Sequence, residues 1–193
     1  MNEKIKELLD QIADIEDEIE KIINERQEKI LYIYEDGKIK FREGIEEAHR
    51  KLKQTLFRYF LESELRNVLS APFIYSMFVP LLLLDLSIIL YQLTCFKLYR
   101  IRKVERSRYV VIDRYKLVHL NSMERLNCVF CGYANGVLAY AREVAARTEQ
   151  YWCPIKHARK VIGRHSRYHD FIDFGDATDY HERLADYRRS LAN

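Results

Sequence analysis

Three of the four cysteines in this chain lie in two short stretches whose spacing suits a metal ion. Cys128 and Cys131 form C-x-x-C within "NCVFCGY", and Cys153 is followed four positions later by His157 within "WCPIKH". Three thiolates and one imidazole suit tetrahedral Zn²⁺, with iron as the second choice. Because four protein ligands fill every position, the predicted site of Cys128, Cys131, Cys153 and His157 is closed and structural.

Two other interpretations of these residues stay open. The cysteines can be small buried hydrophobic residues, with His157 on the surface. If His157 is not a ligand, three thiolates leave a free metal position for redox or hydrolytic chemistry. The N-terminus "MNEKIKELLDQI" lacks an apolar secretory core, so we expect no export signal and disfavour disulfides. The sequence assigns no catalytic residue, and it has no phosphate-binding loop or dinucleotide fingerprint.

The elements that must position these ligands follow from local sequence. Gly132 allows a tight turn after Cys131, and the alanine-rich stretch "YANGVLAYAREVAARTEQYW" predicts a helix between the two pairs. Pro154 is favoured at the first position of a helix, where residues i and i+4 face the same way. We therefore expect Cys153 and His157 to share one helical turn.

Charge divides the chain into an acidic front, an apolar middle and a basic end. Residues 1–67 contain 13 Lys and Arg against 17 Asp and Glu, whereas residues 97–193 contain 19 against 11. The predicted fold class is mainly α, in four parts. These are a coiled-coil helix over 1–30, a hairpin and amphipathic helix over 31–67, a membrane segment over 68–98, and a small basic helical domain over 99–193 that binds the metal.

The first part carries an apolar heptad seam. The apolar residues follow 3-4 spacing: Ile5, Leu8, Ile12, Ile15, Ile19 and Ile22. Isoleucine at both seam positions favours oligomers larger than dimers, so residues 5–22 predict a homo-oligomer or a protein partner. The alternative is an amphipathic helix packed on its own domain. Farther on, Asp36-Gly37 indicates either a β-hairpin or a loop, and a long amphipathic helix is expected after it.

The apolar middle is long enough for a membrane helix. The segment "APFIYSMFVPLLLLDLSIILYQLTCF" has 26 residues, and a spanning helix needs about 20. Pro80 interrupts it near the middle, and Asp85 lies deep within it, where a charge requires a partner. Three arrangements fit: a single kinked span, a shallow hairpin broken at Pro80, and a buried helix of a soluble protein.

The basic end predicts contact with lipid headgroups. The stretch "KLYRIRKVERSRYVVIDRYK" follows the apolar segment directly, which favours anionic lipid over nucleic acid and places this domain on the cytoplasmic side of a membrane. Within the domain we expect one or two short strands, the first at "RYVVID", and "RYKLVHLNSMERLN" predicts a helix.

Residues 68–177 resemble a family of uncharacterised bacterial membrane-associated proteins. The resemblance is carried by "NVLSAPFIYSMFVPLLLLDL", by the stretch from "YVVIDRYK" through "CVFCGYANG" to "EQYWCPIKHARKVIG", and by "RYHDFIDFGDA". It implies membrane association and a cysteine-containing C-terminal domain, and it brings no activity. We therefore expect a membrane-associated, metal-binding interaction or scaffold protein. The alternative is a metal-dependent or redox enzyme at the membrane surface, with Asp85 and the cysteines at its centre.

Overall fold

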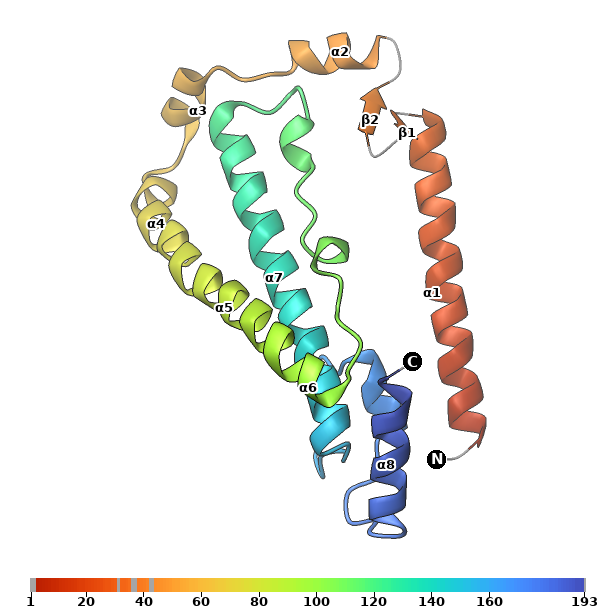
Figure 1. Cartoon of the computed structure of the whole chain (residues 1–193). Helices are drawn as coiled ribbons and strands as arrows, with labels where there is room; N and C mark the ends of the chain where they lie inside the picture. The colour runs from red at the N-terminus through yellow and green to blue at the C-terminus, as the bar shows by residue number, and fades with distance from the viewer. Residues whose placement is uncertain (1–2, 31, 36–37, 42–43, 193) are drawn as a thin grey trace. The chain divides into compact units, whose positions relative to one another are not determined.

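The computed structural model describes residues 3–30, 32–35, 38–41 and 44–192 (Figure 1). The chain divides into two compact units, one of residues 1–59 with 117–121 and the other of residues 60–116 with 122–193. Both consist mainly of helices, which confirms the predicted fold class.

The first unit contains α1 (Glu3–Ile30), β1 (Tyr32–Glu35), β2 (Lys38–Phe41) and α2 (Ile45–Lys51). The strands pair antiparallel with Tyr32 opposite Phe41, so the hairpin is found rather than the loop. Its Asp36-Gly37 turn lies outside the described residues. The predicted helix over 1–30 is present as α1, and its seam residues from Leu8 to Ile22 are 49–56% exposed. The side chain of Ile5 is outside the described part.

The prediction of one long amphipathic helix after the hairpin is wrong. The chain instead forms α2, α3 (Leu56–Glu62) and α4 (Leu65–Ser76), with breaks at 52–55 and 63–64. Thr55 and Ser63 lie at these breaks. Hydroxyl side chains there compete with the helix for backbone hydrogen bonds, which favours a helix end over its continuation.

The apolar middle of the chain is a single helical run. It comprises α4, α5 (Phe78–Tyr91), the π-helical turn η1 (Gln92–Phe96) and α6 (Lys97–Tyr99), and we call Leu65–Tyr99 the apolar helix. The chain does not turn back at Pro80, so the alternative of a shallow membrane hairpin broken at Pro80 is wrong. Pro80 lies in the first turn of α5, where a missing N–H costs little, and the N–H of Leu81 still reaches the carbonyl of Met77 at 3.2 Å.

The C-terminal elements also differ from expectation. No strand forms over 108–113; this stretch begins at the last residue of the short 3₁₀ turn η2 (Arg106–Arg108), and η3 (Arg114–Lys116) follows it. The predicted helix from Arg114 begins only at Ser122, as α7 (Ser122–Trp152). The remaining elements are η4 (Ser166–Asp170) and α8 (Tyr180–Ser190), and a single parallel bridge joins Ile155 to Ile172. The short strands predicted for this domain are therefore wrong.

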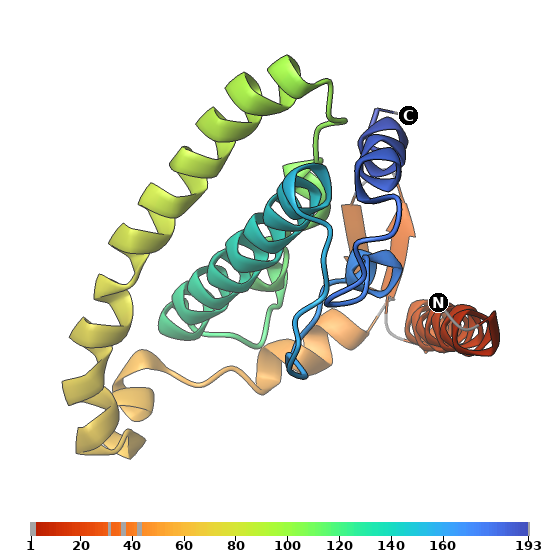
Figure 2. The same cartoon turned by 90° about the horizontal axis from the view of Figure 1, so that it is seen from below.

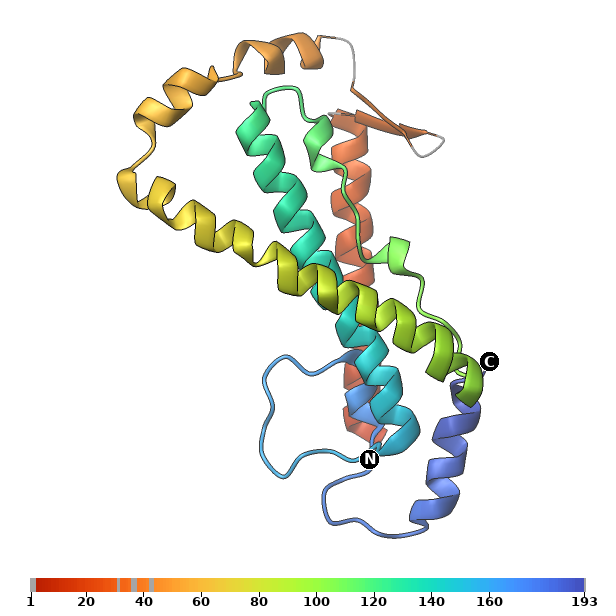
Figure 3. The same cartoon turned by 60° about the vertical axis from the view of Figure 1, so that its left-hand side comes forward.

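The apolar helix and α7 run in the same direction, as Figures 1 and 3 show. Their contacts advance together along both helices, from Tyr75 with Asn127, through Gln92 with Tyr140, to Tyr99 with Tyr151. Residues 101–116, which follow the apolar helix, therefore return along the two helices in a largely extended form, and we call them the returning segment. In Figure 2, α7 lies between the apolar helix and α8. Buried side chains from these elements form the largest core cluster: Phe96, Ile101, Val104, Tyr140, Val144 and Leu191.

The returning segment lies directly against α7 because two glycines provide the space. A Cβ on Gly136 would come within 2.7 Å of the carbonyl oxygen of Tyr109 and the Cα of Val110. A Cβ on Gly132 would approach the carbonyl oxygen of Val111 at 3.3 Å. The spacing of the two glycines, one helical turn, thus serves close backbone packing.

We expect Gly136→Ala to destabilise the second unit by about 1–3 kcal/mol, because rigid backbone atoms block the new methyl group. Gly132→Ala is the matched control on the same helix. Its contact is only slightly tight, and alanine gains about 1 kcal/mol of helix propensity over glycine, so a near-neutral effect is expected. Thermal unfolding followed by circular dichroism checks the pair, and equal destabilisation by both changes would contradict this account of the glycines.

Candidate functional site

The four predicted metal ligands do not meet in this fold. Cys128 and Cys131 lie inside α7, and Cys153 directly follows its last residue. Since a helix rises 1.5 Å per residue, the 25 residues from Cys128 to Cys153 span about 37 Å. A zinc–sulfur bond is about 2.3 Å long. One ion therefore cannot bind both pairs within a chain while α7 is continuous.

The local turns expected around these ligands are also absent. Cys131 and Gly132 continue α7 instead of forming a tight turn, and residues 153–157 are not helical. The N–H of His157 donates to the hydroxyl of Tyr168 at 2.7 Å. Among the described residues, no group of three or more His, Cys, Asp or Glu side chains could hold a metal ion. A Zn²⁺ or iron cofactor thus stays a prediction from the sequence alone.

A charge pair with a buried carboxylate lies where the apolar helix meets α7. Asp85 is 4% exposed, and its carboxylate accepts hydrogen bonds from Nε and Nη2 of Arg106 at 2.9 and 2.6 Å. The hydroxyl of Tyr133 donates a third, at 3.0 Å. The hydrogen bond to Asp85 raises the pKa of Arg106 above its ordinary value, so the pairing favours the charged form of the guanidinium.

Two helical turns farther along, Gln92 fixes the returning segment to the same interface. Its amide nitrogen donates to the carbonyl of Val104 and the hydroxyl of Tyr140, at 3.2 and 3.0 Å. Its amide oxygen accepts from the N–H of Val104 at 2.7 Å. Asp85 pairs with Tyr133 and Gln92 pairs with Tyr140, so the spacing is seven residues on both helices. Asp85 and Gln92, the buried polar residues of the apolar helix, therefore point into the protein and are hydrogen-bonded there.

An apolar pocket of about 610 Å³ opens beside the charge pair. Aromatic and aliphatic side chains from the apolar helix, the returning segment and α7 line it, with Asp85 and Arg106 also in the lining: Tyr75, Phe78, Leu82, Ile112, Leu126, Val129, Phe130 and Tyr133. Its size and apolar walls suit an alkyl chain or a large apolar side chain.

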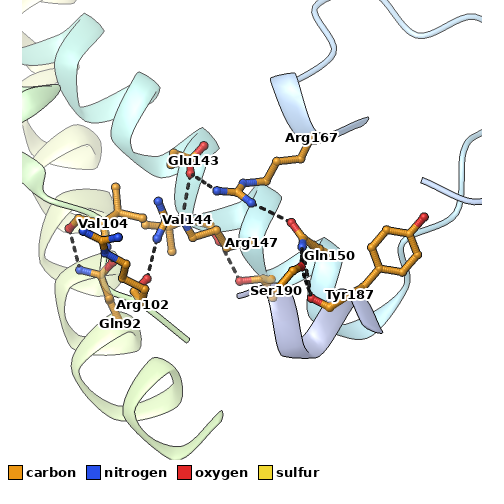
Figure 4. A network of polar contacts seen from close by, with 11 residues as sticks. Gln92, Arg102, Val104, Glu143, Val144, Arg147, Gln150, Arg167, Tyr187 and Ser190 are labelled. Atoms are coloured by element: carbon orange, nitrogen blue, oxygen red, sulfur yellow. Dashed lines mark hydrogen bonds and ion pairs between the residues drawn. The ribbon is translucent and has the colours of Figure 1, made fainter. Parts of the chain in front are cut away.

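A second polar network ties α7 to the C-terminal part (Figure 4). Oε1 of Glu143 accepts from Nε of Arg147 at 2.8 Å and from Nη2 of Arg167 at 3.2 Å. Gln150 accepts from Nη1 of Arg167 at 2.8 Å, and its amide nitrogen donates to Oγ of Ser190 at 2.9 Å. Two arginines thus share one half-buried carboxylate.

Sequence reasoning identified Asp85 as needing a partner but did not find that partner. Arg106 lies 21 residues away and Tyr133 48 residues away, and no periodicity links them to Asp85. The available signal was a single acid within an apolar run, followed by a cluster of arginines. In the second network, the pairing of Glu143 with Arg147 follows from their four-residue spacing on a helix, whereas Arg167, 24 residues from Glu143, was missed.

Comparison with known proteins adds no relative, since no protein-family model, curated protein or solved structure matches the chain.

Proposed function

We propose that this chain is a membrane-associated interaction protein, with its apolar helix lying in one leaflet and α1 joining it to further copies. One observation carries the proposal. The two buried polar side chains of the apolar helix, Asp85 and Gln92, face the protein, whereas its outer face is largely apolar, and only 11% of its most apolar window is buried. The exposed side chains include Leu65, Leu69, Phe73, Val79, Leu83, Leu86, Leu90 and Leu98. An apolar surface of this kind is typical of contact with a membrane or a partner protein.

The polarity of neighbouring segments favours a helix in the plane of the membrane over one that crosses it. Residues 101–116 return alongside the apolar helix, are not helical over most of their length, and carry exposed charges such as Glu105, Arg108 and Lys116. In a spanning arrangement these groups would be at the depth of hydrocarbon, where free backbone and charges are costly. In the plane of the membrane, they face the aqueous side.

The end of the apolar helix has the composition of a membrane interface. Tyr99 stacks on Tyr151 with ring centroids 4.9 Å apart and meets Trp152 edge-on at 5.5 Å. Tyrosine and tryptophan concentrate where hydrocarbon meets headgroups. The basic segment that follows favours the anionic cytoplasmic leaflet, so both units are proposed to lie on the cytoplasmic side.

Depth-dependent fluorescence quenching tests this proposal. The chain has one tryptophan, so Trp152→Phe gives a silent background for Leu69→Trp, Leu83→Trp and Leu90→Trp. Positions 69 and 83 are about 21 Å apart along the helix. Brominated lipids should report the same shallow depth at all three positions. A maximum of quenching at 83 from bromines near the bilayer centre would show a spanning helix instead, and no quenching at any position would show that a protein covers this face.

The exposed seam of α1 is proposed to bind a second copy of the chain. Its isoleucines occupy both seam positions, which favours assemblies of three or more helices. We expect the full chain in detergent to be an oligomer by light scattering. Ile15→Lys with Ile19→Lys should give a monomer. Ile23→Lys, which changes an equally exposed residue off the seam, should leave the oligomer intact; a monomeric wild-type protein would overturn self-association.

A further inference from the structure

A small basic pocket lies between the returning segment, α7 and the C-terminal part of the chain. Its volume is about 220 Å³. Five cationic side chains line it, from three separate stretches of sequence: Arg102, Lys103, Arg108, Arg147 and Arg167. Ser190 and Tyr109 add two hydroxyl groups, and Glu105 is the one carboxylate in the lining. The cations therefore outnumber the acid in the wall by a wide margin.

Three of the cations have no carboxylate partner in the part of the chain that the structure describes. The side chains of Arg102, Lys103 and Arg108 are exposed and form no ion pair with any described residue. The other two, Arg147 and Arg167, share Glu143 alone. Nε of Arg167 is buried and has no acceptor among the described residues. Like charges so close together repel one another, and a bound anion would relieve that repulsion.

The pocket is held in place before any ligand binds. Nη1 of Arg147 donates to the carbonyl of Arg102 at 2.6 Å, which fixes the returning segment to α7. The N–H of Arg102 donates to the carbonyl of Leu191 at 3.0 Å, and Gln150 holds both Arg167 and Ser190 (Figure 4). Each wall is thus bonded to its neighbour, which lowers the entropy cost of binding.

The chemistry of the lining selects the ligand. Guanidinium groups pair two N–H donors with two phosphate oxygens, and a phosphate monoester carries close to two negative charges at neutral pH. A volume of about 220 Å³ admits one such group with a few attached atoms.

We propose that this pocket binds the dianionic phosphate of a phosphomonoester. Arg102, Lys103 and Arg108 supply the uncompensated charge, and Arg147 and Arg167 form the back wall. The phosphate can belong to a lipid headgroup or to a free metabolite, and the two sources share the same recognition chemistry. The inference does not depend on the membrane proposal, because a soluble phosphomonoester tests the pocket by itself.

Titration calorimetry with glycerol 3-phosphate on the full chain in detergent is the first arm of the test. The pocket variant replaces Arg102, Lys103 and Arg108 by glutamine. The matched control replaces Lys97, Arg100 and Lys116, three exposed cations of the same unit that do not line the pocket, by glutamine. We expect saturable one-to-one binding by wild type, at least a tenfold weaker affinity in the pocket variant, and a change of less than about threefold in the control.

The second arm separates the two sources of phosphate. Binding of wild type and of the pocket variant is compared on two kinds of phosphatidylcholine vesicle, one with phosphatidic acid and one with phosphatidylglycerol, at equal surface charge. A preference of wild type for phosphatidic acid that the pocket variant loses indicates a lipid phosphate. Binding of glycerol 3-phosphate without that preference indicates a free one. An equal loss of affinity in the pocket variant and the control variant, or no saturable binding in either arm, would overturn the proposed phosphate site. Phosphate binding without any binding to phosphatidylcholine vesicles would overturn the membrane proposal and leave the pocket standing.

Discussion

Replacing Leu83, Leu86 and Leu90 together by glutamate should release the protein from neutral phosphatidylcholine vesicles. All three side chains are more than half exposed on the outer face of the apolar helix. Each buried leucine contributes about 1.5–3 kcal/mol of transfer free energy, so three contribute about 4.5–9 kcal/mol. Because 1.4 kcal/mol corresponds to tenfold, partitioning should fall by about a thousandfold or more. Vesicle flotation measures it.

The matched control places three glutamates at exposed apolar positions outside that helix. Leu52, Ile162 and Phe174 are at least as exposed as the three leucines, and Ile162 is 94% exposed. The control adds the same charge but should leave vesicle binding within a few-fold of wild type. If both triple variants dissociate equally, charge rather than the apolar face decides binding. If neither dissociates, the proposed anchor is wrong. Circular dichroism in detergent verifies that both variants keep their helices.

Arg106→Met should destabilise the second unit by about 3–5 kcal/mol, the cost of leaving a buried charge without its partner. The change deprives Asp85 of a bidentate ion pair and leaves it only the hydroxyl of Tyr133. Asp85→Leu should cost less. The side chain of Arg106 is 37% exposed against 6% for Asp85, so the arginine can still reach water when its partner is lost.

The double variant Asp85→Leu with Arg106→Met completes the cycle. With both charges gone, only the Tyr133 hydroxyl loses an acceptor, and the double variant should be more stable than Arg106→Met alone. Thermal unfolding in detergent compares the four proteins. Strictly additive losses would mean that the two side chains act independently, against the geometry of the pair.

The predictions of the α1 helix and of the apolar helix depend on patterns within short stretches of sequence. The seam of α1 and the apolar run each extend over a few helical turns, and helix formation responds to residues three or four apart. These elements were therefore predictable, as was the hairpin from Asp36-Gly37 and the strands that flank it. The boundaries were less predictable, as the breaks at Thr55 and Ser63 show.

The cysteine pattern predicts a metal site whose two ligand pairs this fold keeps apart, for a related reason. C-x-x-C followed at a distance by C-x3-H matches a metal site only if the chain turns between the pairs. The alanine-rich stretch was correctly expected to be helical, but the helix starts at Ser122 and includes the first pair as well. A continuous α7 then separates the pairs by its own length. The same helical propensity that supported the prediction removes the turn that it needed.

By itself, the sequence determined that the chain is mainly helical, that one segment is apolar enough to enter a membrane, and that Asp85 in that segment needs a partner. Only the tertiary structure decided that this partner is Arg106, that the apolar face points outward, and that Arg102, Lys103, Arg108, Arg147 and Arg167 line one pocket. Local periodicity encodes which elements form, because it acts over neighbouring residues. Contacts between residues 20 to 60 positions apart depend on how the returning segment packs against Gly132 and Gly136 of α7, and no local pattern records that.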